Sequence, residues 1–571
     1  MRAAAGMTGL LVAAGLTATG TPVQAAVRSG PLIGVIVRTG SSQDADRVEA
    51  AVRRSGGTVG RPLALISGFA AQIPSGAVAE LRATRGVAEV TADGSVRMTA
   101  DQWNSDNQND SSVDSVKTAA GIKTSLTGAG IGVALIDSGV APVTGLKEPG
   151  KVINGPDLSF ESQTPGLANI DTYGHGTHMA GIIAGSDPST VDSNRFQGIA
   201  PGAHLISLKV AASDGATDVS QVIAAIDWAV THRNDTGLNI RVLNLSFGTD
   251  STQDEKLDPL SYAVEAAWRS GIVVVVAVGN DGTAVTHVSM PAANPYVIAV
   301  GAADTHGTVT RTDDTVATFS SRGNTTRHAD LLAAGRSMVS LRDPGSNIDT
   351  AYPGARITDS ADNLRLFRGS GTSQATAVVS GSVALLLQQR PALSPDQVKS
   401  LLTRTADPIA GAVPVAAGAG QINVAAATAL ATPTDTKVTQ TFTAATGLGK
   451  LEASRGTAHV ADATTGTMLT GEKDIFGAPW VPAKWAPLSK TGNAWSGGIW
   501  NGNTWSGTGY TGSSWASVTW GAATWTVPGW TGRSWTGSDW SGRSWTTGGW
   551  TGRSWTTGTW FGRSWTGGSW T

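Results

Sequence analysis

The sequence predicts an α/β protein whose largest part is a doubly wound, mostly parallel β-sheet. In residues 115–430, short apolar runs alternate with amphipathic helical patterns, which is typical of repeated strand–helix units. Residues 30–99 have the pattern of a small α+β domain. Residues 480–571 place an aromatic side chain or a lysine at every fifth position. We expect a linker or small irregular module at residues 431–479, between the sheet and this repetitive tail.

The N-terminus has the pattern of a secretory signal peptide over residues 1–26. Arg2 precedes an apolar stretch around Leu10 to Leu16, and the small residues Ala25 and Ala26 suit a cleavage site. No later run reaches the ~18 apolar residues that a membrane helix requires. We therefore expect a secreted, extracellular protein without a membrane span.

Composition excludes several classes of protein. The 571 residues contain 41 Lys and Arg against 43 Asp and Glu, so the net charge of −2 does not predict a nucleic-acid partner. The cysteine count is zero, which rules out disulfides and thiolate metal sites. A hydrophobic content of 40% is enough for a large core. We expect a monomer.

The small N-terminal domain is predicted to contain two helices and a four-stranded sheet. Its segments are apolar Leu32–Val37, amphipathic Asp44–Arg54, strand-like Leu63–Ile73, helical Gly76–Thr84 and extended Val87–Thr91. A polar stretch that resembles a linker follows and continues through Asp114.

The elements of the large domain follow from the same periodicities. The predicted strands are Gly132–Ile136, Leu205–Val210, Val242–Leu245, Ile272–Val278 and Val297–Val300. The predicted helices are Val219–Val230, Pro259–Arg269, Ser373–Gln389 and Pro395–Arg404.

Three glycine-rich segments carry residue types that act together in nucleophilic catalysis. They are Ile136–Gly139, Gly174–His178 and Gly371–Ala375, and they present Asp, His and Ser in that order. A serine oxygen attacks a carbonyl, an imidazole accepts its proton, and a carboxylate holds the imidazole in one tautomer. His175 and His178 both fall in the first turn of one predicted helix, so the residues alone leave open which of them is the base.

A fourth segment adds an amide at a strand end. The apolar run Ile272–Val278 predicts a buried strand, and Gly279-Asn280-Asp281 follow it. Ligand sites in open α/β sheets lie at the carboxyl ends of strands. The Asn280 amide could donate to the oxyanion of a tetrahedral intermediate there, and the alternative is a simple turn residue.

Taken together, these segments identify the chain as similar to the subtilisin-like serine peptidases, or subtilases. The resemblance covers Lys117 to Ala426. It also includes the segments Gly198–Ala203, Val242–Gly248 and Phe319–Gly323.

The resemblance implies a role for each matched residue. It makes Asp137 the orienting carboxylate, His175 rather than His178 the general base, Ser373 the nucleophile, and Asn280 the oxyanion-hole side chain. It implies a doubly wound subtilisin-like fold and no cofactor for catalysis. Protein or peptide substrates are expected.

The same resemblance places the substrate beside two short segments. Ser246, Phe247 and Gly248 would form one wall of the primary specificity pocket, and Ala277, Val278 and Gly279 the opposite wall. The loop Asp214–Asp218 would be an edge along which substrate residues pair as a strand. The chain departs from the family at three positions, which are Phe247 for a smaller aliphatic residue, Gln374 for Met, and Ala377 for Pro.

The small domain resembles the inhibitory propeptides of subtilases. In that family the propeptide templates folding and its C-terminal end occupies the active site until it is cut, which here points to Val96–Thr99. Its own propeptide is thus an expected intramolecular inhibitor. Relatives often bind structural calcium, and the loop Ser186–Asn194 is acidic without offering a defined ligand set.

The tail contains seventeen tryptophans at a five-residue spacing, with arginines at 533, 543, 553 and 563. A period of five suits short strands between glycine-containing turns, stacked as the coils of a β-solenoid, and the alternative is a flexible tail. Exposed indoles could bind cell-wall polymer or polysaccharide, or could pack on one another in a spacer.

Two functions therefore compete for the whole chain. One is a secreted serine endopeptidase made as an autoprocessed zymogen. The other is an inactive protease fold that acts as a surface-binding protein through the repeat. The complete Asp, His and Ser set together with Asn280 favours the enzyme.

Overall fold

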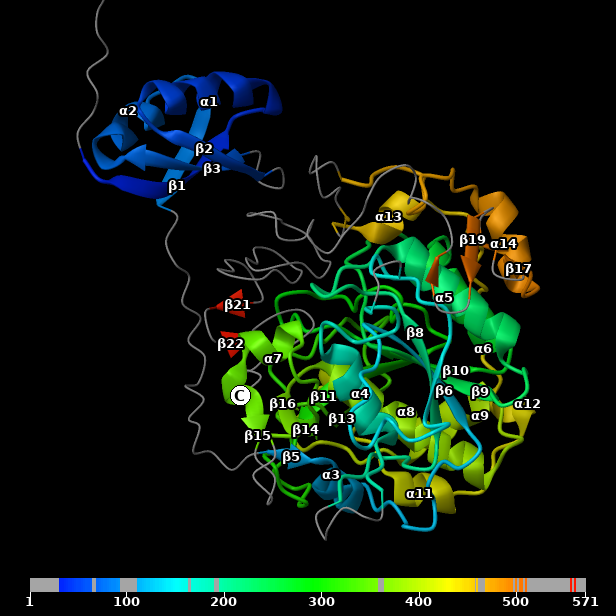
Figure 1. Cartoon of the computed structure of the whole chain (residues 1–571). Coiled ribbons are helices and arrows are strands. Elements are labelled where there is room, and N and C mark those ends of the chain that lie inside the picture. The colour runs from blue at the N-terminus through cyan, green and yellow to red at the C-terminus, as the bar shows by residue number, and fades with distance from the viewer. Residues whose placement is uncertain are drawn as a thin grey trace, which may run out of the picture. The chain divides into compact units, whose positions relative to one another are not determined.

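The computed structural model describes most of the chain and divides it into two compact units, Met1–Arg97 and Met98–Thr571 (Figure 1). The described residues are 30–63, 68–92, 110–162, 166–188, 195–357, 364–457, 459–460, 468–496, 499–500, 503–506, 509–510, 555–556 and 559–560. The predicted signal peptide and most of the repetitive tail lie outside them.

The N-terminal unit is a four-stranded antiparallel sheet with two α-helices. Its strands are β1 (Leu32–Thr39), β2 (Thr58–Leu63), β3 (Gly68–Pro74) and β4 (Val87–Ala92), in the order β2-β3-β1-β4. Its helices are α1 (Ala45–Arg54) and α2 (Val78–Arg82). This βαββαβ order is that of ferredoxin-like folds.

One predicted strand of this unit is wrong in its extent. Leu63–Ile73 reads as a single strand, but Leu63 ends β2 and Gly68 begins β3, which pairs antiparallel with it. The sequence stays mostly apolar between Leu63 and Gly68, so hydrophobicity alone does not separate the two strands. The strands and α1 bury one small core, which includes Val35, Val37, Val48, Val52, Phe69, Ile73 and Val90.

The larger unit is built on an eight-stranded, mostly parallel sheet. Its path is β12-β11-β10-β9-β6-β8-β7, with β13 paired to β11. The strands are β6 (Gly132–Asp137), β7 (Val152–Asn154), β8 (His204–Lys209), β9 (Ile240–Leu245), β10 (Val273–Ala277), β11 (Ile298–Asp304), β12 (Thr315–Val316) and β13 (Leu331–Ala334). The chain leaves β6 toward β7 and β8 and then continues on the other side at β9, so the strand order reverses at β6.

The central strands lie between two pairs of helices (Figure 1). Helix α4 (His175–Ala184) packs against α8 (Thr372–Gln389), and α5 (Val219–His232) packs against α6 (Pro259–Arg269). All five residues of β10 are buried, as expected for a parallel strand covered on both faces. The remaining helices are α3 (Val113–Ala119), α7 (Asn347–Ala351), α9 (Pro395–Thr405), α10 (Pro414–Ala417), α11 (Val424–Ala429), α12 (Asp435–Val438), α13 (Leu451–Arg455) and α14 (Pro482–Lys490).

The start of this unit differs from the expectation of a linker through Asp114. Asp110 forms an ion pair with Arg368, and β5 (Ser111–Ser112) pairs with β14 (Met338–Leu341) in a second sheet that also contains β15 (Arg356–Ile357) and β16 (Leu366–Gly369). The Ser112 hydroxyl then accepts from Ser115 N and caps α3. Ser and Asp are typical of linkers and of helix caps alike, which is why the sequence did not separate the two.

Residues 431–510, as far as they are described, form a C-terminal module, of which α12 packs on α9 and the rest on α5 and α6 (Figure 1, yellow to orange). Trp480, Trp485, Trp495 and Trp500 are all buried, and Trp480 lies 4.8 Å from Trp485 between ring centroids. The carboxylate of Asp227 on α5 accepts from the indole N–H of Trp485 at 3.1 Å. The first tryptophans of the repeat thus belong to the core of the larger unit.

The first pentads of the repeat form helix α14 (Pro482–Lys490), so the expectation of short strands is wrong there, where Trp485 packs on α6 from a helix. The described part after α14 consists of short antiparallel strands. They are β17 (Trp495–Ser496), β18 (Ile499–Trp500), β19 (Asn503–Ser506), β20 (Gly509–Tyr510), β21 (Trp555–Thr556) and β22 (Thr559–Trp560). Trp495 is opposite Trp500, and Trp555 is opposite Trp560, so one pentad corresponds to one strand and its turn. The stacked-coil solenoid stays a prediction for residues outside the described ones.

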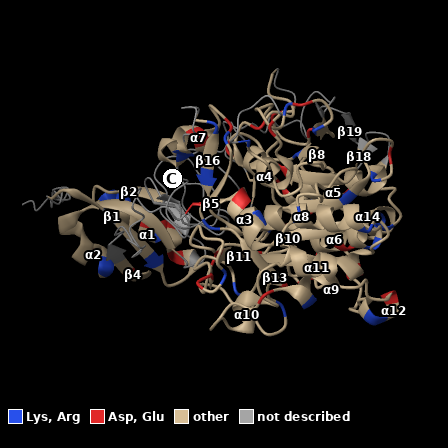
Figure 2. Cartoon of the chain, turned by 90° about the horizontal axis from the view of Figure 1, so that it is seen from below, with Lys and Arg blue, Asp and Glu red and all other residues tan. Residues whose placement is uncertain are grey.

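Charges of both signs are interspersed over the larger unit (Figure 2). No helix among the described residues is long and apolar enough to cross a membrane.

Candidate active site

Four segments of the larger unit meet at the carboxyl edge of the sheet. Strands β8, β6, β9 and β10 are consecutive neighbours and run parallel. Asp137 ends β6, the loop Asp214–Asp218 follows β8, Ser246–Gly248 follow β9, and Asn280 follows β10. The point of strand-order reversal, where α/β folds place their ligands, therefore carries the predicted site residues.

Asp137 and His175 form a buried hydrogen-bonded pair. His175 Nδ1 lies 2.6 Å from Asp137 Oδ1, and neither side chain is more than 1% exposed. Ser138 N also donates to Asp137 Oδ1 at 2.8 Å, which fixes the carboxylate. With its Nδ1 proton held by Asp137, the imidazole has its basic lone pair on Nε2.

His178 lies in the same turn but has different surroundings. Its Nε2 lies 3.1 Å from the carbonyl oxygen of Phe367, in the second sheet. Burial lowers the pKa of His178 to about 3, so this imidazole stays neutral. The structure therefore brings His175, and not His178, to the carboxylate at the end of β6.

Asp171 was missed by the sequence reasoning and holds the turn in which His175 lies. Its Oδ1 accepts from Gly174 N at 2.7 Å and from the Ser138 hydroxyl at 2.8 Å, and its Oδ2 accepts from Thr177 N at 2.7 Å. It is an acid at the N-terminus of α4, where N–H groups lack intrahelical partners. Burial raises the pKa of Asp171. An Asp four residues before the histidine was the available signal.

Glycine is required where α4 approaches the turn after β6. A Cβ on Gly176 would lie 2.1 Å from the carbonyl oxygen of Gly139. This distance is far below van der Waals contact, so any larger residue at 176 would push His175 away from Asp137.

Ser373 lies in the first turn of α8, the helix that packs on α4. It is 1% exposed, and its hydroxyl donates to the carbonyl oxygen of Ser246 at 2.9 Å. The first N–H groups of α8 have no intrahelical acceptor and the dipole of the helix is positive at this end. Negative charge that develops beside Ser373 is therefore stabilised by the helix.

Asn280 is held with its amide oxygen turned toward α8. Thr372 N and the Thr372 hydroxyl both donate to Asn280 Oδ1, at 2.9 and 2.8 Å. Asn280 is 4% exposed, and its Nδ2 is buried without a hydrogen-bond partner among the described residues. Such an amide can donate a hydrogen bond to a ligand, and Thr372, the residue before Ser373, holds it in place.

The two segments expected as pocket walls are both tied to Ser289 and Met290. Thr249, just after the first wall, exchanges two backbone hydrogen bonds with Met290, and Ser289 N donates to the carbonyl oxygen of Val278 in the second wall. Segments from two different strand ends are thus fixed to one further stretch of the chain.

Both walls also approach the side chain of Ser289 closely. A Cβ on Gly248 would lie 2.8 Å from the Ser289 hydroxyl oxygen, and a Cβ on Gly279 would lie 3.2 Å from it. Of the other wall residues, Ser246, Ala277 and Val278 are buried, whereas Phe247 is half-buried and packs against the main core.

The loop Asp214–Asp218 is held at both of its ends. Asp214 Oδ1 accepts from Ala216 N, and burial together with Glu161 raises the pKa of Asp214 well above its ordinary value. Asp218 caps α5 by accepting from Ser220 N at 2.9 Å. Its second partner, Arg455, comes from the C-terminal module.

Gln374 and Ala377, two of the departures from the family pattern, are both fully buried in α8. Neither Nε2 nor Oε1 of Gln374 has a hydrogen-bond partner among the described residues. A buried amide without hydrogen-bond partners lowers the stability of the fold, and this one lies directly after Ser373.

No group of three or more His, Asp or Glu side chains that could hold a metal is found in the described ranges. In the acidic loop that we considered for calcium, the Asp187 carboxylate already binds Arg365 and Phe196 N. Residues 189–194 of that loop lie outside the described residues.

Comparison with known proteins identifies the family. A model of the subtilase family matches residues 128–449, which is more than half of the chain. The chain belongs to the subtilase family. It carries the serine endopeptidase domain of that family, and the matched range contains Asp137, His175, Asn280 and Ser373.

Similarity to individual subtilases supports the same family assignment. Serine protease AprX of Bacillus subtilis is 39% identical over 304 residues, which are 52% of this chain and 66% of AprX. Subtilisin DY of Bacillus licheniformis is 34% identical over 304 residues, or 91% of its length. Minor extracellular protease Epr of Bacillus subtilis is 32% identical over 296 residues, which span 51% of this chain and 36% of Epr.

The N-terminal unit also matches a family. A model described as a putative peptidase inhibitor domain covers residues 14–93. This subtilase therefore carries an inhibitor-type propeptide domain before its protease domain. Neither family model reaches the tryptophan repeat.

Proposed function

We propose that this subtilase is a secreted endopeptidase that cleaves proteins through an acyl-enzyme at Ser373. The observation that carries the proposal is the 2.6 Å contact between His175 Nδ1 and Asp137 Oδ1, on a helix that packs against the helix bearing Ser373. A base oriented by a buried carboxylate next to a serine is the arrangement that acyl transfer requires.

In the proposed reaction Ser373 Oγ bonds to the carbonyl carbon of the substrate, and its proton passes to His175 Nε2. Asp137 stabilises the imidazolium that forms. The C–N bond then breaks, and His175 returns the proton to the leaving amine. In the second half a water molecule attacks the acyl carbon and gives a proton to His175. The bond between the acyl carbon and Ser373 Oγ then breaks, and His175 returns that proton to Oγ, which releases the acid product and restores the enzyme.

The oxyanion of each tetrahedral intermediate lies within reach of Asn280 Nδ2 and the first N–H groups of α8 in this proposal. The free Nδ2 and its fixed amide plane support it. Donors that are held in place before the reaction need no reorganisation when charge develops.

Substrate residues before the cleaved bond are proposed to lie between the walls Ser246–Gly248 and Ala277–Gly279 and along the loop Asp214–Asp218. Phe247 would contact the residue on the acyl side. The position of these segments after β9, β10 and β8, at the edge that holds Asp137, supports this assignment.

The chain is further proposed to be an exported zymogen with residues 1–26 as signal peptide and residues 30–99 as propeptide. The matched inhibitor-type domain supports the zymogen. The leader-like N-terminus and the extracellular protease Epr among the relatives support export.

The nature of the nucleophile is tested by labelling the secreted protein with a fluorophosphonate probe. We expect the wild type to be labelled and the Ser373→Ala protein to remain unlabelled. Equal labelling of both proteins would refute Ser373 as the nucleophile.

The tail is proposed to bind an anionic cell-wall polymer or polysaccharide. Beyond Tyr510 the sequence has twelve tryptophans at the five-residue spacing, with four arginines and Asp539 as the charged residues. Indole rings stack on sugar rings, and the positive charge attracts anionic polymers at low salt.

Truncation after Tyr510 tests the tail and keeps the buried Trp480, Trp485, Trp495 and Trp500 in place. The truncated enzyme should cleave a short peptide within about twofold of the wild-type rate, because no catalytic segment is removed. It should no longer sediment with insoluble cell walls. Equal sedimentation of both proteins would refute binding and favour a spacer.

A further inference from the structure

The end of helix α13 in the C-terminal module connects two segments of the protease domain. The connecting residues are Ser454–Thr457, and they lie beyond the range 128–449 that matches the subtilase family. One connected segment is the loop Asp214–Asp218 after β8. The other is Ser246–Asp250 after β9. Because β8 and β9 lie on either side of β6, these two segments border the position of Asp137.

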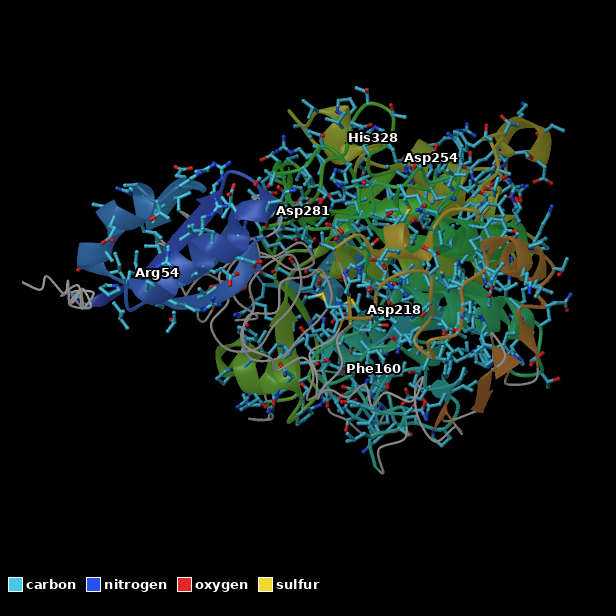
Figure 3. All side chains as sticks on the ribbon, turned by 90° about the horizontal axis from the view of Figure 1, so that it is seen from above. Arg54, Phe160, Asp218, Asp254, Asp281 and His328 are labelled. Carbon is cyan, nitrogen blue, oxygen red and sulfur yellow. The ribbon has the colours of Figure 1, made fainter. Side chains whose placement is uncertain are left out.

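The first connection is a buried ion pair. Arg455 Nε donates to Asp218 Oδ1 at 2.7 Å, and neither side chain is exposed (Asp218 is labelled in Figure 3). Nη2 donates to Asp218 Oδ2 at 3.4 Å and to the carbonyl oxygen of Lys473 in the module. Nη1 bonds within the module alone, to the carbonyl oxygen of Gly471 at 2.8 Å and to Glu452 at 3.1 Å. Arg455 is therefore fixed by its own module and holds the end of the loop from there.

The second connection joins the same stretch to the segment after β9. The Thr249 hydroxyl donates to the carbonyl oxygen of Ser454 at 2.7 Å. Thr457 donates to Asp250 twice, from N at 2.8 Å and from its hydroxyl at 2.9 Å. Asp250 is only 7% exposed whereas Thr457 is exposed, so these bonds lie at the edge of the buried region.

The stretch fits closely enough to demand glycine at one position. Gly456 has φ +62°, and a Cβ there would lie 2.0 Å from Asp250 Oδ1. The nearby Ser454 hydroxyl donates to Asp258 at 3.0 Å, and Asp258 caps α6. The four residues thus contact the start of α5, the start of α6 and the segment after β9.

We propose that Ser454–Thr457 position both borders of the substrate cleft, and that Arg455 is a positioning residue for extended peptide substrates. The inference rests on the proposed function, in which Ser246 begins one wall and the loop Asp214–Asp218 forms the edge that pairs with substrate. An extended peptide binds by main-chain hydrogen bonds to two such borders. The distance between the borders therefore decides how efficiently the enzyme cleaves the peptide. A substrate with only one residue before the cleaved bond does not reach the loop.

The test compares two substrates in Arg455→Met, with the amount of active enzyme set by fluorophosphonate titration. One is a tetrapeptide p-nitroanilide and the other is a single-residue p-nitrophenyl ester. We expect kcat/KM to fall about tenfold or more for the tetrapeptide, chiefly through KM, and to stay within about twofold for the ester. Arg404→Met, the same change at an exposed position on α9, should alter neither.

Arg455→Met leaves the Asp218 carboxylate buried without its cation, which destabilises a fold strongly. The double variant Arg455→Met/Asp218→Asn removes that charge and keeps a side chain that can cap α5. It should show the same selective loss for the tetrapeptide. Thr457→Val, which deletes one bond to Asp250, should show a smaller one.

An equal loss for both substrates in the double variant would overturn the inference, since it would reveal a structural role alone. An unchanged kcat/KM for the tetrapeptide would also overturn it. The absence of fluorophosphonate labelling in the wild type would instead refute the proposed nucleophile, so the two failures are distinguishable.

Discussion

Thr372 fixes the amide plane of Asn280, since its backbone N–H and its hydroxyl both donate to Asn280 Oδ1. The buried Nδ2 is the atom left to act. The residue that precedes Ser373, the proposed nucleophile, thus orients the group proposed to stabilise the oxyanion. Only one peptide bond separates Ser373 from the residue that holds the amide.

This relationship predicts the effect of two substitutions at Asn280. Asn280→Ala should lower kcat by ~10² to 10³ with little change in KM, as known for the equivalent amide of subtilisin, a member of this family. Asn280→Asp keeps the acceptor for Thr372 but loses the donor, and it should be at least as slow. Steady-state kinetics on a tetrapeptide anilide measure both, and a change confined to KM would make Asn280 a turn residue.

Substitutions of the two histidines of α4 should have clearly different effects on kcat. His175→Ala should reduce kcat by about a millionfold, a figure that comes from subtilisin rather than from this geometry. His178→Asn retains a polar side chain near the Phe367 carbonyl, and we expect kcat within about tenfold and a lowered Tm. If His178→Asn proved as inactive as His175→Ala, contact with Asp137 would not be enough to identify the catalytic base.

Autoprocessing should occur between Val96 and Asp101, a range outside the described residues. The Ser373→Ala chain should remain uncut, as shown by N-terminal sequencing of the secreted protein. Residues 31–99 added to mature enzyme should inhibit it at micromolar concentration, because the domain matches a peptidase inhibitor. A Ser373→Ala chain cut at the same bond would mean that another protease performs maturation.

The sequence predicted five of the eight strands of the central sheet, β6 and β8 to β11, because these are long and mostly buried. The short, partly exposed strands β7 and β12 and the short buried strand β13 were not predicted. Ile272–Val278 was expected and β10 covers Val273–Ala277, and Pro259–Arg269 coincides with α6. A run of apolar residues has one stable place in such a fold, between two layers of helices. The catalytic segments were visible for a similar reason, since close approach of backbone, as at Gly176, restricts them to glycine-rich patterns.

The C-terminal module was not predictable in this way. Its contacts with the protease domain use buried polar side chains, such as Arg455 with Asp218 and Trp485 with Asp227. A buried arginine has no periodic signature, and its partner lies 237 positions away in the sequence. Segments rich in Thr, Ala and Gly are typical of a linker and of a small irregular module alike, and the sequence left both open, although the segment packs against α5 and α6.

Gln374→Met is expected to stabilise the protein. Both polar atoms of Gln374 are buried without partners in the described part of the chain, and Met has a similar volume without that cost. The free energy of unfolding should rise by ~1 kcal/mol, seen as a higher Tm in the Ser373→Ala background, which prevents self-digestion. The control is Gln397→Met, because Gln397 is 8% exposed but bonds to the carbonyl oxygen of Pro433 and caps α9. That variant should be less stable, and a fall in Tm for Gln374→Met would imply a hidden partner.

The buried carboxylate of Asp227 should give stability that depends on pH. Burial raises the pKa of Asp227 from 3.8 to about 6, although Ser489, Trp485 and Trp500 donate to it. Between those values the folded protein holds a proton that the unfolded chain has released. This contribution to stability is therefore present at pH 4 and is lost as the pH rises through 6.

Asp227→Asn cannot ionise, so the difference in Tm between the parent and this variant isolates the group. Both proteins are measured in the Ser373→Ala background. Between pH 4 and pH 7.5 the free energy of unfolding of the parent should fall relative to that of the variant by on the order of 3 kcal/mol, seen as a falling difference in Tm. His178 acts in the opposite direction, because its pKa of about 3 favours the folded state at higher pH, but it is present in both proteins and its effect cancels.

The control is Asp114→Asn, at a side chain that is 73% exposed, and it should show no such trend. A pH-independent difference for Asp227→Asn would mean that the carboxylate stays charged among its three donors, and that the module is held by charge-assisted hydrogen bonds throughout this range.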